Sequence, residues 1–276
     1  MRTKTIWISI IAVLIVAAAS TAISCSGCNG SGGSTPDKGA ETTDGTSSQP
    51  GGGASSASAK TIDPATVGVL KGVVKFEGTA PAATPITMTA ECSALHTAPV
   101  PNETFVVNPN KTLANVFVYV KGGLEGYKFP IPKDPAVLDQ HGCMYVPHVI
   151  GVQVGQGLEV RTSDPTTHNV NSQAAKKNTG FNKAMPGGSS ALLARFKTPE
   201  LMIPVKCDIH PWMSAWCCVV NSPFFAVSND KGEFEIAGLP PGKYLLEALH
   251  EASTPKTLEV EIAPKETKTV EFTFTK

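Results

Sequence analysis

The sequence has little of what a helical, strongly charged or nucleic-acid-binding protein needs. Charged residues make up 17% of its 276 positions, and 23 basic residues balance 23 acidic ones, so the formal net charge is zero. A neutral chain has no electrostatic attraction for nucleic acid, and we expect no such partner. No helical periodicity is sustained over three turns after the N-terminus, which argues against a helical bundle. The 25 glycines and 22 prolines favour a turn-rich, all-β fold.

Long apolar runs are also scarce, and the clearest one is N-terminal. Two basic residues precede 14 apolar or small residues, Ile6 to Ala19, which fits a signal peptide and is short for a membrane span. Residues 22–25 (AISC) resemble a bacterial lipobox, with Ala where a larger aliphatic residue is usual. We therefore expect residues 1–24 to be a signal peptide and Cys25 to be a lipidated membrane anchor. An uncleaved anchor is the alternative, and both place the protein outside the cytoplasm, in the periplasm or on the cell surface.

A stretch almost without aliphatic residues follows the anchor. Residues 25–60 are rich in Gly, Ser, Thr and Ala and cannot bury enough apolar surface to fold. We expect a flexible tether that lets the folded part sample several tens of ångströms, roughly, from the anchor.

One short segment, residues 205–216 (VKCDIHPWMSAW), concentrates metal-ligating side chains. Cys207, His210 and Met213 place a thiol, an imidazole and a thioether at Cys-x2-His-x2-Met spacing. Soft sulfur donors favour Cu(I), imidazole suits both oxidation states of copper, and a weak axial Met is typical of electron-transfer sites. Such a site needs a second imidazole, and His168 supplies it from upstream. The four residues together predict one copper site.

This ordered set resembles the ligand signature of the cupredoxins, the blue copper proteins, and its tight loop with Pro211 is most similar to the amicyanin type. The resemblance covers residues 138–222 and implies a Greek-key β-sandwich around a type 1 copper site. It implies that the Asn169 side chain braces the loop that carries the cysteine. It also implies that the second histidine ligand is exposed, and that Pro211 and Trp212, with residues 185–188, form an apolar docking patch for a redox protein.

Other interpretations of the metal-ligating residues stay open. Each of the four alone is explained by an ordinary place in a core, and zinc would accept the cysteine and the histidines, although Met is a poor zinc ligand. A second metal site is a further alternative, because Cys92-x3-His96 and His141-x-Cys143-x4-His148 also bring thiols and imidazoles close in sequence.

The segments that flank the copper region predict a second β unit. Residues 230–244 (DKGEFEIAGLPPGKY) are similar to the carboxypeptidase-regulatory-like β-sandwich module, and residues 68–78 resemble its N-terminal strand. We expect segments 61–137 and 223–276 to form one such sandwich, with the copper domain inserted between them. Separate units in a row are the alternative. His250 and Glu251 would lie at the surface of this unit.

The seven cysteines divide between lipid, copper and pairing. Cys25 is assigned to the lipid and Cys207 to copper, and Cys28 lies in the tether. An oxidising compartment favours pairing of the rest, and adjacent cysteines would close a strained ring. We therefore predict a Cys92–Cys143 disulfide, with one of Cys217 and Cys218 in the core and the other a candidate reactive thiol.

The resemblance implies a one-electron carrier that exchanges electrons with redox proteins and is held at a membrane by its lipid. A lipoprotein β-sandwich with a binding or structural role is the first alternative. A copper-handling protein is the second, but it would have more than the 6 Met and 6 His present. We expect no enzyme activity, because copper oxidases and nitrite reductases need additional copper sites.

Overall fold

A computed structural model describes residues 59–276, which belong to one compact unit. The expected signal peptide, Cys25, Cys28 and all but the last two residues of the expected tether lie outside the described residues. The four-residue α1 (Ala90–Ser93) is the one α-helix among residues 59–276, and sixteen strands make up the other elements. The predicted all-β fold class is therefore confirmed. Within the described range no helix has the length and apolar character that crossing a membrane requires.

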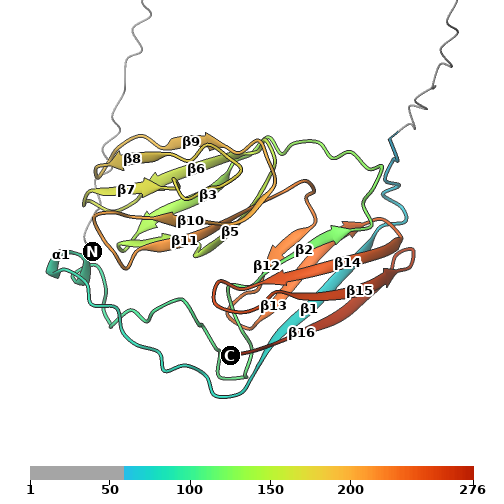
Figure 1. Cartoon of the computed structure of the whole chain (residues 1–276), viewed down its shortest axis with the longest axis horizontal. Helices are drawn as coiled ribbons and strands as arrows, with labels where there is room; N and C mark the ends of the chain where they lie inside the picture. The colour runs from blue at the N-terminus through green and yellow to red at the C-terminus, as the bar shows by residue number, and fades with distance from the viewer. Residues whose placement is uncertain (1–58) are drawn as a thin grey trace, which may run out of the picture. The chain divides into compact units, whose positions relative to one another are not determined.

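One sandwich, called here the terminal sandwich, is built from both ends of the described chain (Figure 1). β1 pairs antiparallel with β13 and parallel with β16 in one sheet, and the second sheet has the order β12-β2-β14-β15. The chain therefore leaves this sandwich after β2 and returns to it at β12. Its strands are β1 (Gly68–Glu77), β2 (Phe117–Gly122), β12 (Phe225–Val227), β13 (Glu233–Leu239), β14 (Gly242–Leu249), β15 (Lys256–Ile262) and β16 (Thr267–Thr275).

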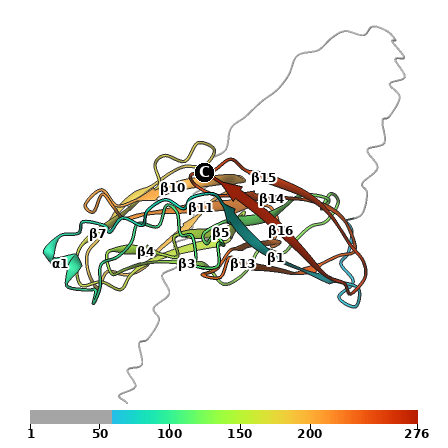
Figure 2. The ribbon, with the colours of Figure 1, turned by 90° about the horizontal axis from the view of Figure 1, so that it is seen from below.

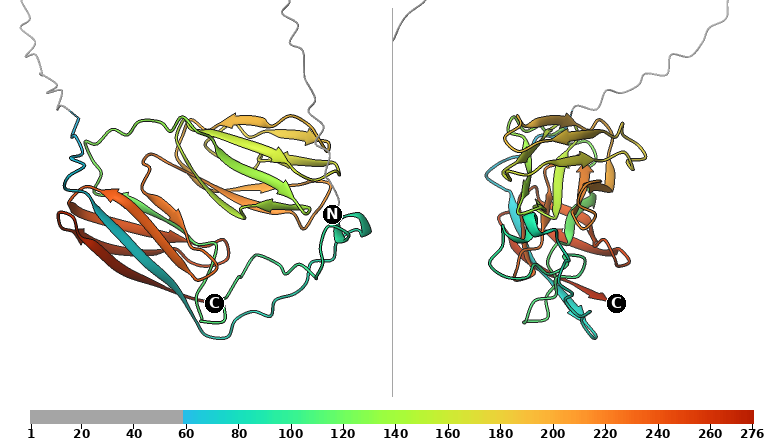
Figure 3. Two further views of the ribbon diagram at one scale, coloured as in Figure 1. Left: turned by 180° about the vertical axis from the view of Figure 1, so that it is seen from behind. Right: turned by 90° about the vertical axis from the view of Figure 1, so that its left-hand side faces the viewer.

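The intervening chain forms the inserted sandwich, whose sheets have the orders β5-β11-β10-β7-β8 and β4-β3-β6-β9. All nine strands come from residues 136–220, so the flanking segments donate none (Figure 3). The strands are β3 (Ala136–His141), β4 (Met144–Val146), β5 (Val149–Gln153), β6 (Gly157–Thr162), β7 (His168–Asn171), β8 (Asn182–Met185), β9 (Leu192–Arg195), β10 (Glu200–Lys206) and β11 (Ser214–Val220).

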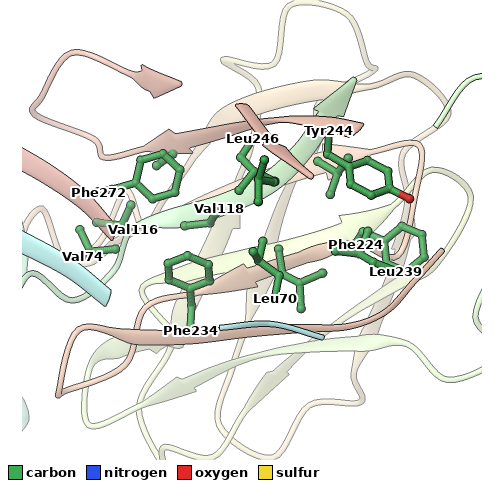
Figure 4. Packing of buried hydrophobic residues seen from close by; sticks show 14 of the residues in the cluster. Leu70, Val74, Val116, Val118, Phe224, Phe234, Leu239, Tyr244, Leu246 and Phe272 are labelled. Atoms are coloured by element: carbon green, nitrogen blue, oxygen red, sulfur yellow. The ribbon is translucent and has the colours of Figure 1, made fainter. Parts of the chain in front are cut away.

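The terminal sandwich has an apolar core. Every second residue of β1 is buried, as expected for a strand with one face against a core. Leu70 and Phe234 from one sheet face Val118 and Leu246 from the other (Figure 4). The positions that alternate in the sequence therefore supply the side chains that hold the two sheets together.

A third apolar cluster lies where β11 and β5 meet β2 and β12, and it includes Phe117, Val149 and Cys218. Glu251 adds polar contacts there, because it accepts hydrogen bonds from Trp216 (2.9 Å) and pairs with the His148 ring (2.6 Å). The expected surface position of His250 and Glu251 is wrong: His250 is 5% exposed and the Glu251 side chain 12%.

Candidate metal centre

The loop between β10 and β11 carries three of the four predicted ligands. The two strands pair up to Lys206 and Ser214, which closes residues 207–213 into a hairpin loop. Inside it the Cys207 N–H donates to the Met213 carbonyl (3.1 Å), and the Met213 N–H donates to the His210 carbonyl (2.9 Å). Cys207 and Met213 are 3% and 1% exposed and belong to the core of the inserted sandwich. The loop thus holds both sulfur-bearing side chains in the interior.

His168 comes to this loop from β7, of which it is the first residue. Its side chain is fully buried, and its Nδ1 atom lies 3.0 Å from Nδ1 of His210. The Sγ atom of Cys207 lies 3.7 Å from the same His210 nitrogen. One ligand atom from each of the three residues lies within 4.8 Å of the other two. Two imidazoles and a thiol therefore converge on one buried point.

A carboxylate determines which nitrogen of His168 faces that point. Asp164 Oδ2 lies 2.9 Å from Nε2 of His168. Because a carboxylate accepts, the hydrogen-bond network assigns the ring proton to Nε2 and leaves the Nδ1 lone pair free. The free nitrogen is the one that faces His210, as a metal ligand must.

Asn169 ties β7 to the ligand loop. Its Oδ1 atom accepts from the Asp208 N–H (2.6 Å) and from the Cys207 thiol (3.4 Å). Its amide donates to Asp208 Oδ2 (2.8 Å), and Asn171 and Asn182 donate to the same carboxylate. A loop residue is therefore held from two strands through one carboxylate.

Burial and neighbours set the protonation states. Burial raises the pKa of the Cys207 thiol, but the neighbouring His168 ring and hydrogen bonds with the backbone nearby outweigh it, so the pKa lies below its ordinary value. Burial lowers the pKa of His168, yet its hydrogen bonds with Cys207 and Asp164 raise it overall. Burial and then the charge of His168 lower the pKa of His210. The site thus favours a thiolate beside a neutral His210, the forms that bind a metal.

His210 is not the exposed ligand that the sequence analysis expected, because it is only 4% exposed. The Cys92–Cys143 disulfide joins α1 to the β3–β4 turn, with Cα atoms 5.7 Å apart, and its sulfur atoms lie within 4.8 Å of a His210 ring nitrogen. α1 and its disulfide form a cap beside β7 (Figure 2). Access to His210 remains through a surface pocket of about 530 Å³, which is lined by Thr89, Glu91, Pro165, Thr166, Thr167, Ile209 and His210.

The residues of the expected docking patch differ in their exposure and do not form one surface. Pro211 is exposed, whereas Trp212 is half-buried, lies beside the His210 ring in a tilted arrangement (ring centroids 5.2 Å apart) and donates to the Cys143 carbonyl (3.1 Å). Met185 is 2% exposed and packs in the core, so it adds nothing to a surface. Trp212 therefore contacts the cap through its hydrogen bond to Cys143.

Among residues 59–276, the remaining cysteines and histidines form no second centre. Cys217 lies in the core of the inserted sandwich and Cys218 in the cluster between sandwiches, as alternation along β11 predicts. Burial raises the pKa of both thiols, that of Cys218 to about 12, so the expectation of a reactive thiol is wrong. The alternative second metal site is also wrong: the disulfide uses its two cysteines, and no convergent group within residues 59–276 contains His96, His141 or His148.

Comparison with known proteins gives matches in structure alone. No protein-family model and no curated protein matches the chain. A copper-containing nitrite reductase from Thermus scotoductus is similar over 54% of this chain and 28% of its own length, at 15% identity and a TM-score of 0.31. The chain thus spans little more than a quarter of that protein.

Two further structures match the chain over most of their own length. A purple cupredoxin from Nitrosopumilus maritimus is 19% identical over 30% of this chain and 98% of its own, with a TM-score of 0.26. A variant of amicyanin is 20% identical over 32% of this chain and 85% of its own, with a TM-score of 0.28. Since these scores and identities are low, the case for a metal centre depends on the geometry of the three converging side chains.

Proposed function

We propose that the chain is a type 1 copper electron-transfer protein, a one-electron carrier tethered outside the cytoplasm. The observation that supports the proposal is the buried convergence of His168, Cys207 and His210 within 4.8 Å. The donor set fits copper, because a thiolate with two imidazoles, and a thioether as the fourth predicted ligand, matches the softness of copper in both oxidation states. Zinc fits less well, since the fourth ligand that the sequence predicts is Met213 and a thioether is a poor zinc ligand.

Each residue has a stated task in this proposal. His168, Cys207 and His210 would hold the ion, with Met213 as the fourth and weakest donor. Bound copper would supply the one-electron change between Cu(II) and Cu(I). The chain keeps the donors in place: buried strands carry them, and Asn169 fixes the loop to β7. Because the ligand side chains are held in place by the protein, they would move little when the bound ion changes between Cu(II) and Cu(I).

The proposed route for electrons leads through His210. His210 lines the surface pocket, and the neighbouring Ile209 and Pro211 are exposed, Ile209 to 51%. A redox protein would contact this apolar rim. The contact surface includes Thr89 and Glu91 of the cap, so the partner would meet the cap as well as the ligand loop.

The remaining parts of the proposal concern placement of the carrier. Lipidation at Cys25 would anchor the chain, and residues 25–60 would give it reach. The terminal sandwich, whose residues 230–244 resemble the carboxypeptidase-regulatory-like module, would serve as a structural support. We propose a carrier and not an enzyme.

The visible spectrum of the full chain in detergent, loaded with Cu(II), tests the proposal. We expect an intense orange-red absorption that makes the solution blue and is lost in Cys207→Ser. Cys218→Ser is the matched control, because Cys218 is a buried free thiol in a different cluster, and it should keep the colour. A wild-type chain that stays colourless and binds no copper would remove the carrier and leave a tethered β-sandwich binding module.

A further inference from the structure

Asp164 is the buried carboxylate closest to the candidate centre, and nothing in the ligand pattern accounts for it. It is 4% exposed. Its Oδ2 atom contacts Nε2 of His168, the nitrogen that points away from Cys207 and His210. Burying a carboxylate costs free energy unless its oxygens are hydrogen-bonded. The groups that donate hydrogen bonds to Asp164 therefore explain how it can be buried.

The β3–β4 turn forms a cradle for this carboxylate. Gly142 and Cys143, the two turn residues, have φ values of 63° and 53°, as two-residue hairpins of type I′ require. Their backbone N–H groups donate to Asp164, Gly142 to Oδ1 and Cys143 to Oδ2, both at 2.7 Å. Successive N–H groups in such a turn form a concavity that binds anions. A Cβ on Gly142 would lie 2.8 Å from the His96 ring, so the turn also has no room for a side chain there.

These contacts direct the Asp164 carboxylate to the turn and to the His168 ring. Asp164, His168 and Cys143 do form a convergent group, but Cys143 is in a disulfide. Both Asp164 oxygens already accept backbone N–H groups, and Oδ2 also accepts from His168. The carboxylate therefore acts on the centre through the imidazole.

We propose that Asp164 is a positioning residue that fixes the tautomer of His168 and strengthens the Nδ1 atom as a donor, an inference that rests on the proposed copper function. A carboxylate behind a ligating imidazole orients the ring and raises its basicity. A stronger donor stabilises Cu(II) more than Cu(I). Asp164 therefore lowers the reduction potential of the centre, and the disulfide-bonded turn holds it in position to do so.

The first experiment compares Asp164→Asn with the wild type in the full chain. We expect Cu(II) affinity, measured by competition with a chelator, to fall about 10–100-fold, and Cu(I) affinity to change much less. The reduction potential should rise by about 59 mV for each tenfold difference between the two losses. Asp230→Asn removes an exposed carboxylate in the terminal sandwich and should leave both quantities unchanged. Asp164→Glu keeps the carboxylate and should recover part of the loss.

An unchanged potential and Cu(II) affinity in Asp164→Asn, with the absorption intact, would overturn the role of Asp164 and leave the carrier standing. Absence of the absorption in the wild type would instead overturn the carrier. If Asp164→Asn does not fold, nitrogen-15 NMR of the metal-free wild type decides. We expect the Nε2 proton of His168 to be present and to exchange slowly with water, and a neutral ring with its proton on Nδ1 alone would contradict the proposal.

Discussion

The two sandwiches have similar apolar centres but differ in what else they bury. The terminal sandwich has an apolar core and buries scattered polar side chains such as Ser228 and Glu247, which do not converge as a metal-ligating group. The inserted sandwich buries a thiol, two imidazoles, a carboxylate and an amide close together: Cys207, His168, His210, Asp164 and Asn169. Buried polar groups cost free energy unless their hydrogen bonds are satisfied. A sandwich with only a structural role has no need of such a set, which is why we assign the chemistry to the inserted one.

The largest effect is expected from a substitution that creates a cavity in the core of the terminal sandwich. The Phe234 ring covers Gly72, where an added Cβ would lie 2.2 Å from the ring. Phe234→Ala should lower the free energy of unfolding by about 3–5 kcal/mol, measured by denaturant titration. The copper absorption of the folded protein should not change. Leu193→Ala, at a site that is 54% exposed, is the control and should cost less than about 0.5 kcal/mol.

A copper absorption altered by Phe234→Ala would show that the two sandwiches are not independent in function. The cluster around Phe117 and Cys218 joins them, so a change there has a defined physical route.

Removal of the disulfide that holds the cap should have the next largest effect on stability. The Cys92–Cys143 bridge spans 51 residues of sequence, and replacing both cysteines by Ser should cost roughly 2–4 kcal/mol. Because the disulfide lies against His210, a chelator should also remove copper faster from this variant than from Cys218→Ser. Equal rates of removal would mean that the Trp212 side, and not the disulfide, shields the centre.

The sequence was most informative where neighbours in space are neighbours in the chain. Period-two patterns located the strands of the terminal sandwich, such as β13 and β16. The ligand loop is a local motif, and a hairpin closes it. His168 was found because its residue type, order and following Asn169 matched a known pattern. The all-β class followed from composition and from the lack of helical periodicity.

The sequence was least informative where distant segments meet through side chains. Asp164 reaches His168 only because the β3–β4 turn supplies two N–H groups, and no spacing rule encodes that. His210 was expected at the surface from the family resemblance, which does not reveal the cap, and helix α1 of the cap lies more than a hundred positions earlier in the chain. Glu251 is buried by two partners that are distant in sequence, His148 in the segment before β5 and Trp216 on β11. Each error has the same cause, a tertiary contact without a local signature.

Loosening the ligand loop should have a smaller effect on stability. Asn169→Ala removes the acceptor of the Asp208 N–H and a donor to its carboxylate, which should cost about 1–3 kcal/mol. The copper absorption should broaden or shift, because the loop can then take several positions. Asn221→Ala, at an exposed position, is the matched control. A sharp, unshifted absorption would show that the β10–β11 hairpin alone positions Cys207.

The smallest expected effect is a pH dependence at the His148–Glu251 pair. Burial lowers the pKa of His148, but the hydrogen bond with Glu251 and the charge of Glu103 raise it overall. Burial raises the pKa of Glu251, but the bond to His148 lowers it overall. Two further groups face the pair and oppose this trend: burial raises the pKa of Glu103 and lowers that of His250.

The sign of the effect follows from these directions. The contribution of Glu251 is present above its unfolded-state pKa and is lost as pH falls through its lowered folded-state value. That of His148 is present below its unfolded-state pKa and is lost as pH rises through its raised folded-state value. The free energy of unfolding of the wild type should therefore exceed that of Glu251→Gln most at mildly acidic pH, and the difference should shrink towards alkaline pH. A difference that is constant from acidic to alkaline pH would mean that Trp216, which donates to Glu251 whatever the state of His148, accounts for the contact between the sandwiches.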